Sequence, residues 1–271
     1  MEQHLSWLTV FLNKIFGKYI LALLTALHVK PANAAAPLPE YVTMVLVVFV
    51  LGVAGTLWLK RRLSVDRPGA AQQIAEYLLT NPLGFGIRDL LDENVGQHGR
   101  AFVPAVGAVS VFILLSNLLS VIPAFSSPTG HPSVPLACAL VTFLYFNWQG
   151  LRHHGLLGYA KHHAGPVWWL SWLIFPVEVI STSARVLSLT VRLWANMFSS
   201  ELLYVIFLGL LILPVNYVWA KIPAVGAVLG VFPAVIPVIF IGLHIFVAVI
   251  QTYVFTILPS IYLGMAVSEE H

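Results

Sequence analysis

A stretch without a charged residue runs from Ile222 to Val267, 46 residues in which only His244 can take up a proton. As a straight helix it would be about 69 Å long, roughly twice the hydrocarbon core of a bilayer. A hairpin broken near Pro233 and Pro237 would satisfy that length. So would one long, steeply tilted and bent helix, because membrane helices tolerate proline. Either way the stretch predicts a membrane protein.

The composition indicates the same environment. Hydrophobic residues make up 59% of the chain and charged residues 9%, and the mean hydropathy is +0.87. Soluble domains are about one quarter charged. The net charge of +3 comes from basic residues in short segments such as Lys60–Arg62, which is typical of cytoplasmic loops and not of a nucleic-acid surface. The one cysteine, Cys138, excludes an internal disulfide and any cysteine-based metal site.

Other apolar runs predict further membrane helices. Residues 41–59 carry no charge and are long enough to cross the hydrocarbon core. The basic residues after them place the end of this span in the cytoplasm and its start outside. Two more uncharged runs, 101–125 and 134–150, are joined by a turn-rich outer loop at 126–130. With two long tilted C-terminal helices, this predicts an all-α polytopic fold of about five membrane-embedded helices.

Two polar segments separate these runs. Residues 63–100 read as a cytoplasmic connector with a surface helix around 72–79, and 151–166 as a second polar loop. The second loop contains two His-His pairs, at 153–154 and 162–163, which could bind a divalent metal. No carboxylate or cysteine accompanies them, and adjacent histidines on a helix point in different directions. A solvated, partly cationic loop is therefore favoured, with no metal site.

Residues 1–40 form a separate N-terminal segment in this reading, and residues 41–271 form a single membrane domain. The sequence Ala32-Asn33-Ala34 has the pattern of a signal-peptidase site, which would make the start of the chain a cleaved leader. The favoured alternative is a helix lying in the membrane interface. Its apolar residues would lie on or near one side: Trp7, Leu8, Phe11, Ile15 and Ile20.

A stripe of polar residues marks the segment around Arg192. A charged side chain at mid-membrane costs several kcal/mol, so it faces protein or water and suggests function. At 100° per residue, the other members of the stripe lie within about 40° of Arg192 around the helix axis. These are Glu178, Ser181, Arg185, Ser188 and Asn196. A polar stripe about 27 Å long on an apolar helix predicts one wall of a hydrated path.

Glu201 lies nine residues after Arg192, about 180° around the helix and some 13 Å along it. It needs a partner on another helix, and the last helix offers His244 and Gln251, which are seven residues apart and share a face. A carboxylate and an imidazole in one wet pocket can pass protons. The alternative is that Glu201–His244 and Glu178–Arg185 are structural ion pairs.

Arg192 has no carboxylate three or four residues away with which to pair in its own helix. Its acid must come from another helix or another chain, which indicates a partner subunit.

The segment from Ser188 to Glu201 resembles subunit a of the F-type ATP synthase membrane sector, in its spacing of Arg192, Asn196 and Glu201. The similarity covers the chain from about residue 40 to its end. It includes the segments 117–123, 127–129, 244–255 and 262–271.

The resemblance implies that Arg192 faces the carboxylates of a rotating ring of c subunits and bars direct proton flow between two half-channels. The half-channel open to the outside would be lined by Asn117, Asn196, Glu201, His244 and Gln251. The cytoplasmic half-channel would be flanked by Glu178, Ser181, Arg185 and Ser188. Expected partners are the c-ring, b-type peripheral stalk subunits and the rest of the complex, in the cell inner membrane. No cofactor is expected, and the chain has no nucleotide-binding pattern.

Some positions differ from the family pattern. Many bacterial relatives have an acid where this chain has Ser120, and glycine is usual where it has Ala195. Ser133 and Pro135 replace a polar pattern. These differences concern mainly the entrance of the outer half-channel.

Two other functions compete with this interpretation. A stand-alone channel or carrier would need an acid opposite Arg192, and the chain shows no inverted repeat. An intramembrane enzyme would need paired metal ligands or a nucleophile with its base. The ion is expected to be H⁺ because His244 lies in the path.

Overall fold

The computed structural model describes residues 6–29, 33, 36–81, 84–122, 125–164, 168–221 and 231–267. All regular elements in these ranges are helices. The α-helices are α1 (Trp7–Ala26), α2 (Glu40–Arg61), α3 (Ala70–Leu79), α4 (Ile87–Val95), α5 (Val103–Leu119), α6 (Ser133–Ala164), α7 (Ser171–Lys221) and α9 (Val231–Val267). Short 3₁₀ helices are η1 (Gly96–Ala101), η2 (Pro128–Gly130) and η3 (Trp168–Leu170). The predicted all-α fold is confirmed.

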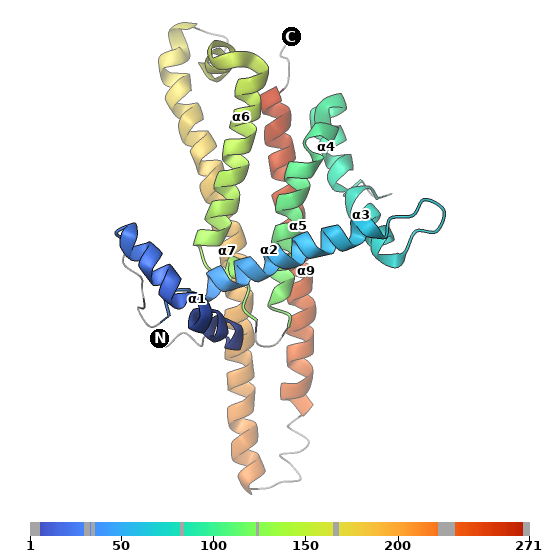
Figure 1. The fold of residues 1–271 in the computed structure, drawn as a ribbon, viewed down its shortest axis with the longest axis vertical. Helices are drawn as coiled ribbons and strands as arrows, with labels where there is room; N and C mark the ends of the chain where they lie inside the picture. The colour runs from blue at the N-terminus through green and yellow to red at the C-terminus, as the bar shows by residue number, and fades with distance from the viewer. Residues whose placement is uncertain are drawn as a thin grey trace.

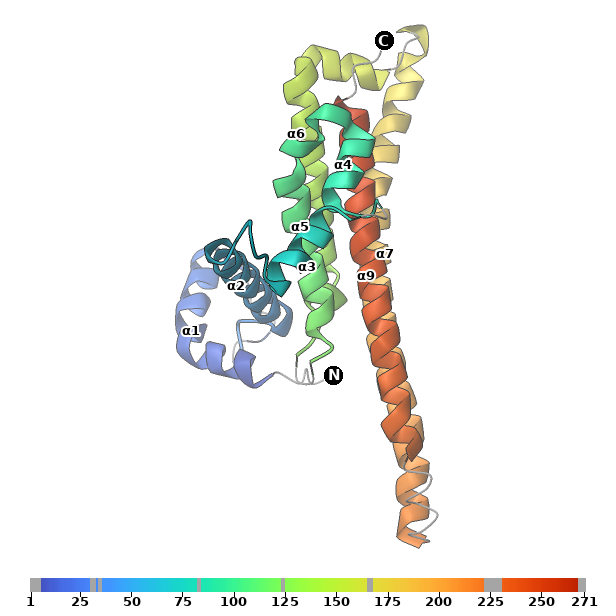
Figure 2. The same ribbon diagram turned by 90° about the vertical axis from the view of Figure 1, so that its right-hand side faces the viewer.

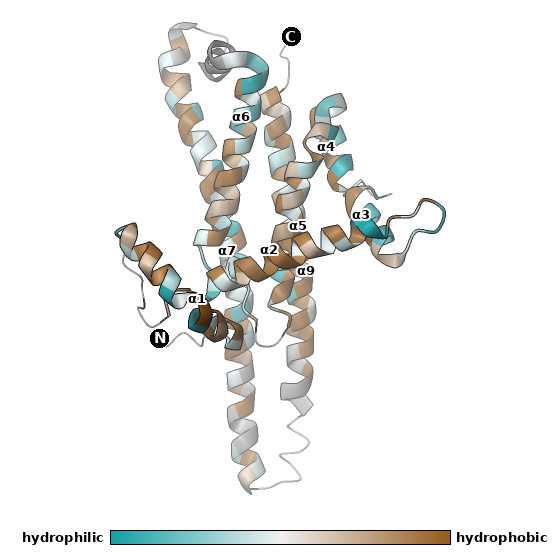
Figure 3. Ribbon diagram, in the orientation of Figure 1, coloured by the Kyte–Doolittle hydropathy of each residue, from teal (hydrophilic) through white to brown (hydrophobic). Residues whose placement is uncertain are grey.

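Five helices are long and apolar enough to cross a membrane, within the ranges above. These spans are Trp7–Ala26, Glu40–Arg61, Ser133–Gly155, Trp172–Phe207 and Val238–Val267, and α5 is a shorter apolar helix. Large apolar side chains face outward along them, such as Phe49 at 61%, Ile180 at 69% and Phe246 at 62% exposed. Such surfaces are stable in lipid and not in water. Figure 3 shows hydrophobic residues along α2 and α9 and hydrophilic residues gathered on α3 and α4.

The two C-terminal helices lie side by side along the length of the molecule (Figures 1 and 2). With 51 and 37 residues, α7 and α9 are about 76 and 55 Å long. Helix α9 continues through Pro233 and Pro237, so the alternative of a hairpin broken at these prolines is wrong. The expectation of two long C-terminal helices is confirmed.

Helix α2 crosses the other long helices instead of running along them (Figure 1). Its 22 residues span about 33 Å, close to the thickness of the hydrocarbon core. It contacts α5 through Met44, Val48 and Leu119. If α2 runs near the membrane normal, α5, α6, α7 and α9 must be steeply tilted, and a tilted helix as long as α7 can lie within the thickness of a bilayer.

The interior is built where α5, α6, α7 and α9 meet. One cluster joins Ile113, Ala139, Leu193, Met197 and Phe255 from these four helices. A second cluster, including Leu91, Phe146 and Leu263, packs α4 against the upper part of the bundle. The sequence predicted the surface helix α3 but not α4, which lies directly against α9 and brings the connector into the core.

The polar segment after residue 150 is mostly helix, so the prediction of a loop from 151 to 166 is wrong. Helix α6 runs to Ala164, and its one non-helical residue is Gly155, with φ 71° and ψ 170°. This positive φ suits glycine and lets the chain turn back on itself. The side chains of His162 and His163 lie outside the described part. Figure 1 places the polar end of α6, the C-terminal end of α9 and α4 at one end of the bundle.

Helix α1 is tied to the start of α2. Ser6 caps it, accepting a hydrogen bond from the Thr9 amide at 3.3 Å, and the Ser6 amide donates to Glu40 at 3.0 Å. Asn13 bonds both backbone groups of Leu38, at 2.9 and 3.0 Å. The apolar residues Trp7, Phe11 and Ile15 point outward, as side chains in contact with lipid would. Two residues of the signal-peptidase-like pattern, Ala32 and Ala34, lie outside the described residues.

Candidate functional site

The predicted polar stripe lies on α7, one continuous helix from Ser171 to Lys221. The neighbouring face of α7 is buried through Leu189, Leu193 and Met197, which pack into the four-helix core. Ser188 and Arg192 are exposed, while Ser181, Arg185 and Asn196 are half-buried. The core contacts therefore fix the rotation of α7 about its axis. The polar stripe faces away from the centre of the four-helix core.

Arg192 is exposed and makes no hydrogen bond or ion pair with any residue the structure describes. The sequence placed the acid for Arg192 on another helix or another chain, and none of the described helices supplies one. A guanidinium is always charged and presents five donors, so it is a strong site for an external carboxylate.

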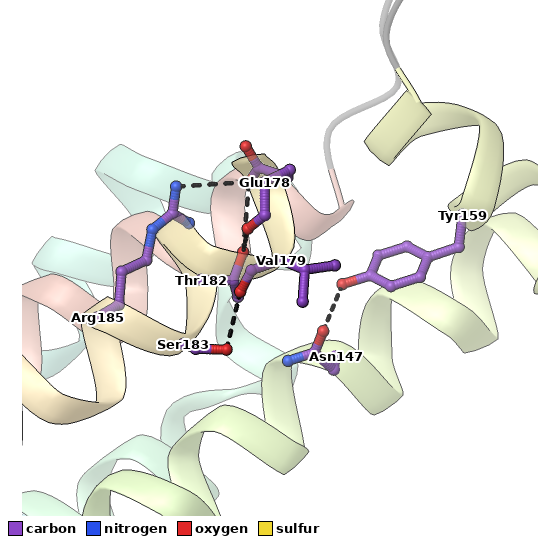
Figure 4. Close-up of polar contacts among 7 residues, drawn as sticks. All are labelled: Asn147, Tyr159, Glu178, Val179, Thr182, Ser183 and Arg185. Atoms are coloured by element: carbon purple, nitrogen blue, oxygen red, sulfur yellow. Dashed lines mark hydrogen bonds and ion pairs between the residues drawn. The ribbon is translucent and has the colours of Figure 1, made fainter. Parts of the chain in front are cut away.

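Glu178 and Arg185, which precede Arg192 on the same helix, form an ion pair. An Arg185 guanidinium nitrogen lies 3.7 Å from Oε1 of Glu178. The guanidinium also lies 4.9 Å from the centre of the Tyr262 ring on α9. Thr182 donates to the Glu178 carbonyl at 2.7 Å and lies 3.4 Å from its carboxylate (Figure 4). The Glu178–Arg185 ion pair is therefore held by residues of α7 and α9 together. Ser181 takes no part in this ion pair.

Tyr159 is a residue that sequence reasoning missed. Because the chain turns back at Gly155, the Tyr159 hydroxyl donates to Oδ1 of Asn147 at 2.8 Å (Figure 4), within electrostatic reach of Glu178 and Arg185. Gly150 leaves room for the ring, since a Cβ there would lie 2.5 Å from Cε2 of Tyr159. Burial and then the Glu178 carboxylate raise the pKa of the Tyr159 hydroxyl, while Arg185 opposes them. The spacing of Gly150, Gly155 and Tyr159 was the only signal in the sequence.

Glu201 and His244 line one cavity of about 330 Å³ between the end of α5, α7 and α9. Glu201 accepts a hydrogen bond from the Ser127 amide at 3.2 Å. Apolar residues such as Val205, Phe240 and Ile241 form the rest of the wall with Ser120, Ser126, Ser200 and Tyr204. The structure thus brings together the two groups that the sequence paired, although no direct bond between them is present among the described residues.

His244 is bonded at both ring nitrogens. Nε2 lies 2.8 Å from the Ser120 hydroxyl and 3.1 Å from the Asn117 carbonyl oxygen. Nδ1 lies 2.9 Å from the Ser200 hydroxyl. The imidazole is therefore fixed between the end of α5 and α7.

The loop before α6 connects Asn117 with Glu201. Thr129 donates to Oδ1 of Asn117 at 2.6 Å and lies 2.6 Å from the Ser127 hydroxyl. Ser127 also donates to the Ser116 carbonyl at 3.1 Å. The outer loop was predicted from its turn residues, but Ser127, Pro128 and Thr129 are buried. The Ser127 and Thr129 hydroxyls bond to the end of α5, and the Ser127 amide bonds to Glu201, so these groups do not face solvent.

Two other predicted residues are placed near the site without fixed partners. Gln251 is buried on α9, two turns from His244, and Asn196 is half-buried on α7. Neither side chain makes a hydrogen bond to another described residue. The structure therefore does not join them to Glu201 or His244.

The histidines of α6 do not gather into a metal centre where they are described. His98 and His153 have ring centres 5.7 Å apart. No group of three or more His, Cys, Asp or Glu side chains that could hold a metal occurs among the described residues.

Comparison with known proteins identifies the family. The sequence model of the ATP synthase A chain family matches residues 41–264. The chain belongs to the ATP synthase subunit a family. ATP synthase subunit a of Koribacter versatilis is 38% identical over 268 residues, covering 99% of both chains. ATP synthase subunit a of Solibacter usitatus is 37% identical, over 89% of this chain and 92% of the relative. Subunit a 1 of Syntrophotalea carbinolica is 38% identical, over 85% and 87%.

As a member of this family, the chain is a non-catalytic, proton-translocating subunit of a bacterial ATP synthase and a multi-pass membrane protein. Ser120, one of the positions at which the sequence was expected to differ from the family pattern, bonds the imidazole of His244. The position is thus polar and in contact with the site, although it carries no charge.

Proposed function

We propose that this subunit provides two offset aqueous half-channels, which deliver protons to and from the carboxylates of a rotating c-ring. Arg192 would face those carboxylates and prevent direct leak between the half-channels. Each proton that crosses gains about 2.3 kcal/mol per 100 mV of membrane potential. The ring would convert that energy into rotation for ATP synthesis.

The exposure of Arg192 carries this proposal. A charge in the apolar part of a membrane helix needs an opposite charge or water, because leaving it unpaired costs several kcal/mol. Arg192 has no such partner in the described chain. A carboxylate on a neighbouring subunit would supply the missing charge.

The polar groups on either side of Arg192 support two separate paths. Glu178 and Arg185 lie before it along α7, and Glu201 lies about 13 Å after it on the opposite face. We assign Glu178, Ser181, Arg185 and Ser188 to the cytoplasmic half-channel. We assign Asn117, Asn196, Glu201, His244 and Gln251 to the outer one. A proton would pass from one to the other only on the ring.

The same proposal gives the orientation of the chain in the membrane and its partner subunits. The start of α2 would be external and the end of α9 cytoplasmic, in the cell inner membrane. Besides the c-ring, b-type peripheral stalk subunits would contact the chain and hold it against the torque. An imidazole in the outer path favours H⁺ as the ion.

Substitution of Arg192 tests the proposal. Arg192→Ala in the whole ATP synthase, studied in inverted membrane vesicles, should abolish ATP-driven proton pumping while the complex still assembles. Arg192→Lys should fail nearly as badly, because a compact ammonium lacks the planar fork of guanidinium. Arg88→Ala, which removes a partly exposed arginine paired with Asp92 on α4, is the control. Normal coupled pumping by either Arg192 variant would contradict the proposed role.

A further inference from the structure

We propose that the Ser200 hydroxyl relays protons to and from Nδ1 of His244; this rests on the outer half-channel proposed above. Ser200 is half-buried on α7, next to Glu201, and lines the cavity that holds both groups. Its oxygen lies 2.9 Å from Nδ1 of His244 and 2.9 Å from the carbonyl oxygen of Met197. The hydroxyl thus has one hydrogen and two acceptors within reach.

The other side of the imidazole fixes which nitrogen changes protonation. Nε2 lies 3.1 Å from the Asn117 carbonyl oxygen, which can only accept a hydrogen bond. The Ser120 hydroxyl, 2.8 Å from Nε2, can donate to the same carbonyl at 3.1 Å and accept from Nε2. Nε2 therefore carries a hydrogen in this arrangement. In the neutral ring Nδ1 is then the acceptor, and it is the nitrogen that gains a proton.

Both protonation states of His244 satisfy their hydrogen bonds through a single hydroxyl rotation. In the neutral state Ser200 donates to Nδ1. In the cationic state Nδ1–H donates to the Ser200 oxygen, and the hydroxyl hydrogen turns to the Met197 carbonyl. Neither state leaves a buried polar group without a partner, which would cost about 1–3 kcal/mol.

The transfer step needs only one reactant besides the two side chains, a proton donor in the cavity. A hydronium ion in the cavity donates a proton to the Ser200 oxygen and becomes water, or the protonated Glu201 carboxyl does so through a water molecule and becomes a carboxylate. The original Oγ–H bond breaks as its proton moves to Nδ1, and a new Oγ–H bond remains. The reverse sequence returns the proton. The other titratable groups that line this cavity are Glu201 and Tyr204.

Ser200 is needed because its hydroxyl is the described group that lies within hydrogen-bond distance of Nδ1. Without the hydroxyl, an Nδ1–H would lose this fixed partner, which would make the protonated ring less favourable.

The test measures ATP-driven proton pumping by the whole ATP synthase in inverted vesicles, at equal amounts of assembled complex. Ser200→Ala should reduce pumping by about a hundredfold, the low end of the loss that removing a proton-transfer group causes. Ser200→Thr keeps the hydroxyl and should restore most of the rate. Ser183→Ala is the matched control, because that hydroxyl on α7 donates to its own helix at Val179. It should leave the rate unchanged.

A double variant separates action through His244 from an independent role of Ser200. Ser200→Ala should add little to the loss caused by His244→Gln, since the hydroxyl acts only through the imidazole. If the two losses multiply, or if Ser200→Ala pumps like Ser183→Ala, the relay is wrong. If His244→Gln itself pumps normally, the proposed outer half-channel is wrong. Loss in His244→Gln with normal pumping by Ser200→Ala overturns only the relay.

Discussion

Glu201 and His244 face one cavity from two helices, and each is held by a different part of the chain. The Ser127 amide holds Glu201, while Ser120, Ser200 and the Asn117 carbonyl surround His244. No hydrogen bond or ion pair joins the two side chains in the described structure. A proton that passes between them must therefore cross the cavity through water or a hydroxyl.

This arrangement predicts strong coupling between the two residues. Glu201→Gln and His244→Gln should each slow ATP-driven pumping, and the double variant should cost little more than either single one. The exchange of Glu201→His with His244→Glu should recover part of the activity, because the acid and the imidazole remain in the same cavity. Pumping rates of the four variants in vesicles measure this. Independent losses that multiply in the double variant would show that the two residues act at separate sites.

Thr129 is predicted to stabilise the loop that carries Ser127. It is fully buried, and its hydroxyl joins Asn117 and Ser127. Thr129→Val removes that hydroxyl and leaves Oδ1 of the buried Asn117 without its partner, at about 1–3 kcal/mol, while Ser127 keeps its bond to Ser116. The expected result is a lower temperature at which subunit a is lost from the detergent-solubilised complex, together with slower pumping.

Two matched variants check this explanation. Thr129→Ser keeps the hydroxyl and should retain most of the stability. Thr142→Val removes a buried hydroxyl that donates only to its own helix, at the Cys138 carbonyl, and should cost less. Equal heat stability of Thr129→Val and Thr142→Val would show that the loop contacts contribute nothing special.

Gly264 is predicted to be essential for the close contact between α9 and α4. A Cβ at this position would overlap the carbonyl oxygen of Asn94, a backbone atom that cannot rotate away. Asn94 also donates to the Ser260 hydroxyl at 3.2 Å, so α4 is held at two points. Gly264→Ala should cost at least about 1–3 kcal/mol, as overpacking does. Heat stability of the complex measures it.

The control is Gly55→Ala on α2, where a Cβ would meet no atom within 4 Å. That change should be neutral or slightly stabilising, because alanine is the better helix former. If Gly264→Ala were as stable as Gly55→Ala, α4 would not be packed on α9 as described.

Sequence periodicity predicted which residues share one face of a single helix. The stripe that includes Arg192 follows from the helix repeat alone, and α7 is one unbroken helix. The sequence also suggested His244 as the partner of Glu201, because the last helix has no other side chain that takes up a proton.

Contacts made by loops and turns could not be predicted in this way. Thr129 looked like an outer-loop residue, yet it is buried against Asn117. Tyr159 reaches Asn147 only because the backbone at Gly155 has a positive φ. Neither contact leaves a periodic signal, because each depends on how a non-helical segment folds back onto a helix.

The orientation of the chain in the membrane gives the last prediction. The polar end of α6, α4 and the end of α9 lie at one end of the bundle (Figure 1). Basic residues at the end of α2 predict that Val65 is cytoplasmic, and the loop before α6 is then external. Thr129 cannot report on this loop because it is fully buried, but Ser133 and Val65 are exposed. In a Cys138→Ala background, Ser133→Cys should react with a membrane-impermeant maleimide added outside, and Val65→Cys only in inverted vesicles. The reverse pattern would invert the chain and exchange the two proposed half-channels.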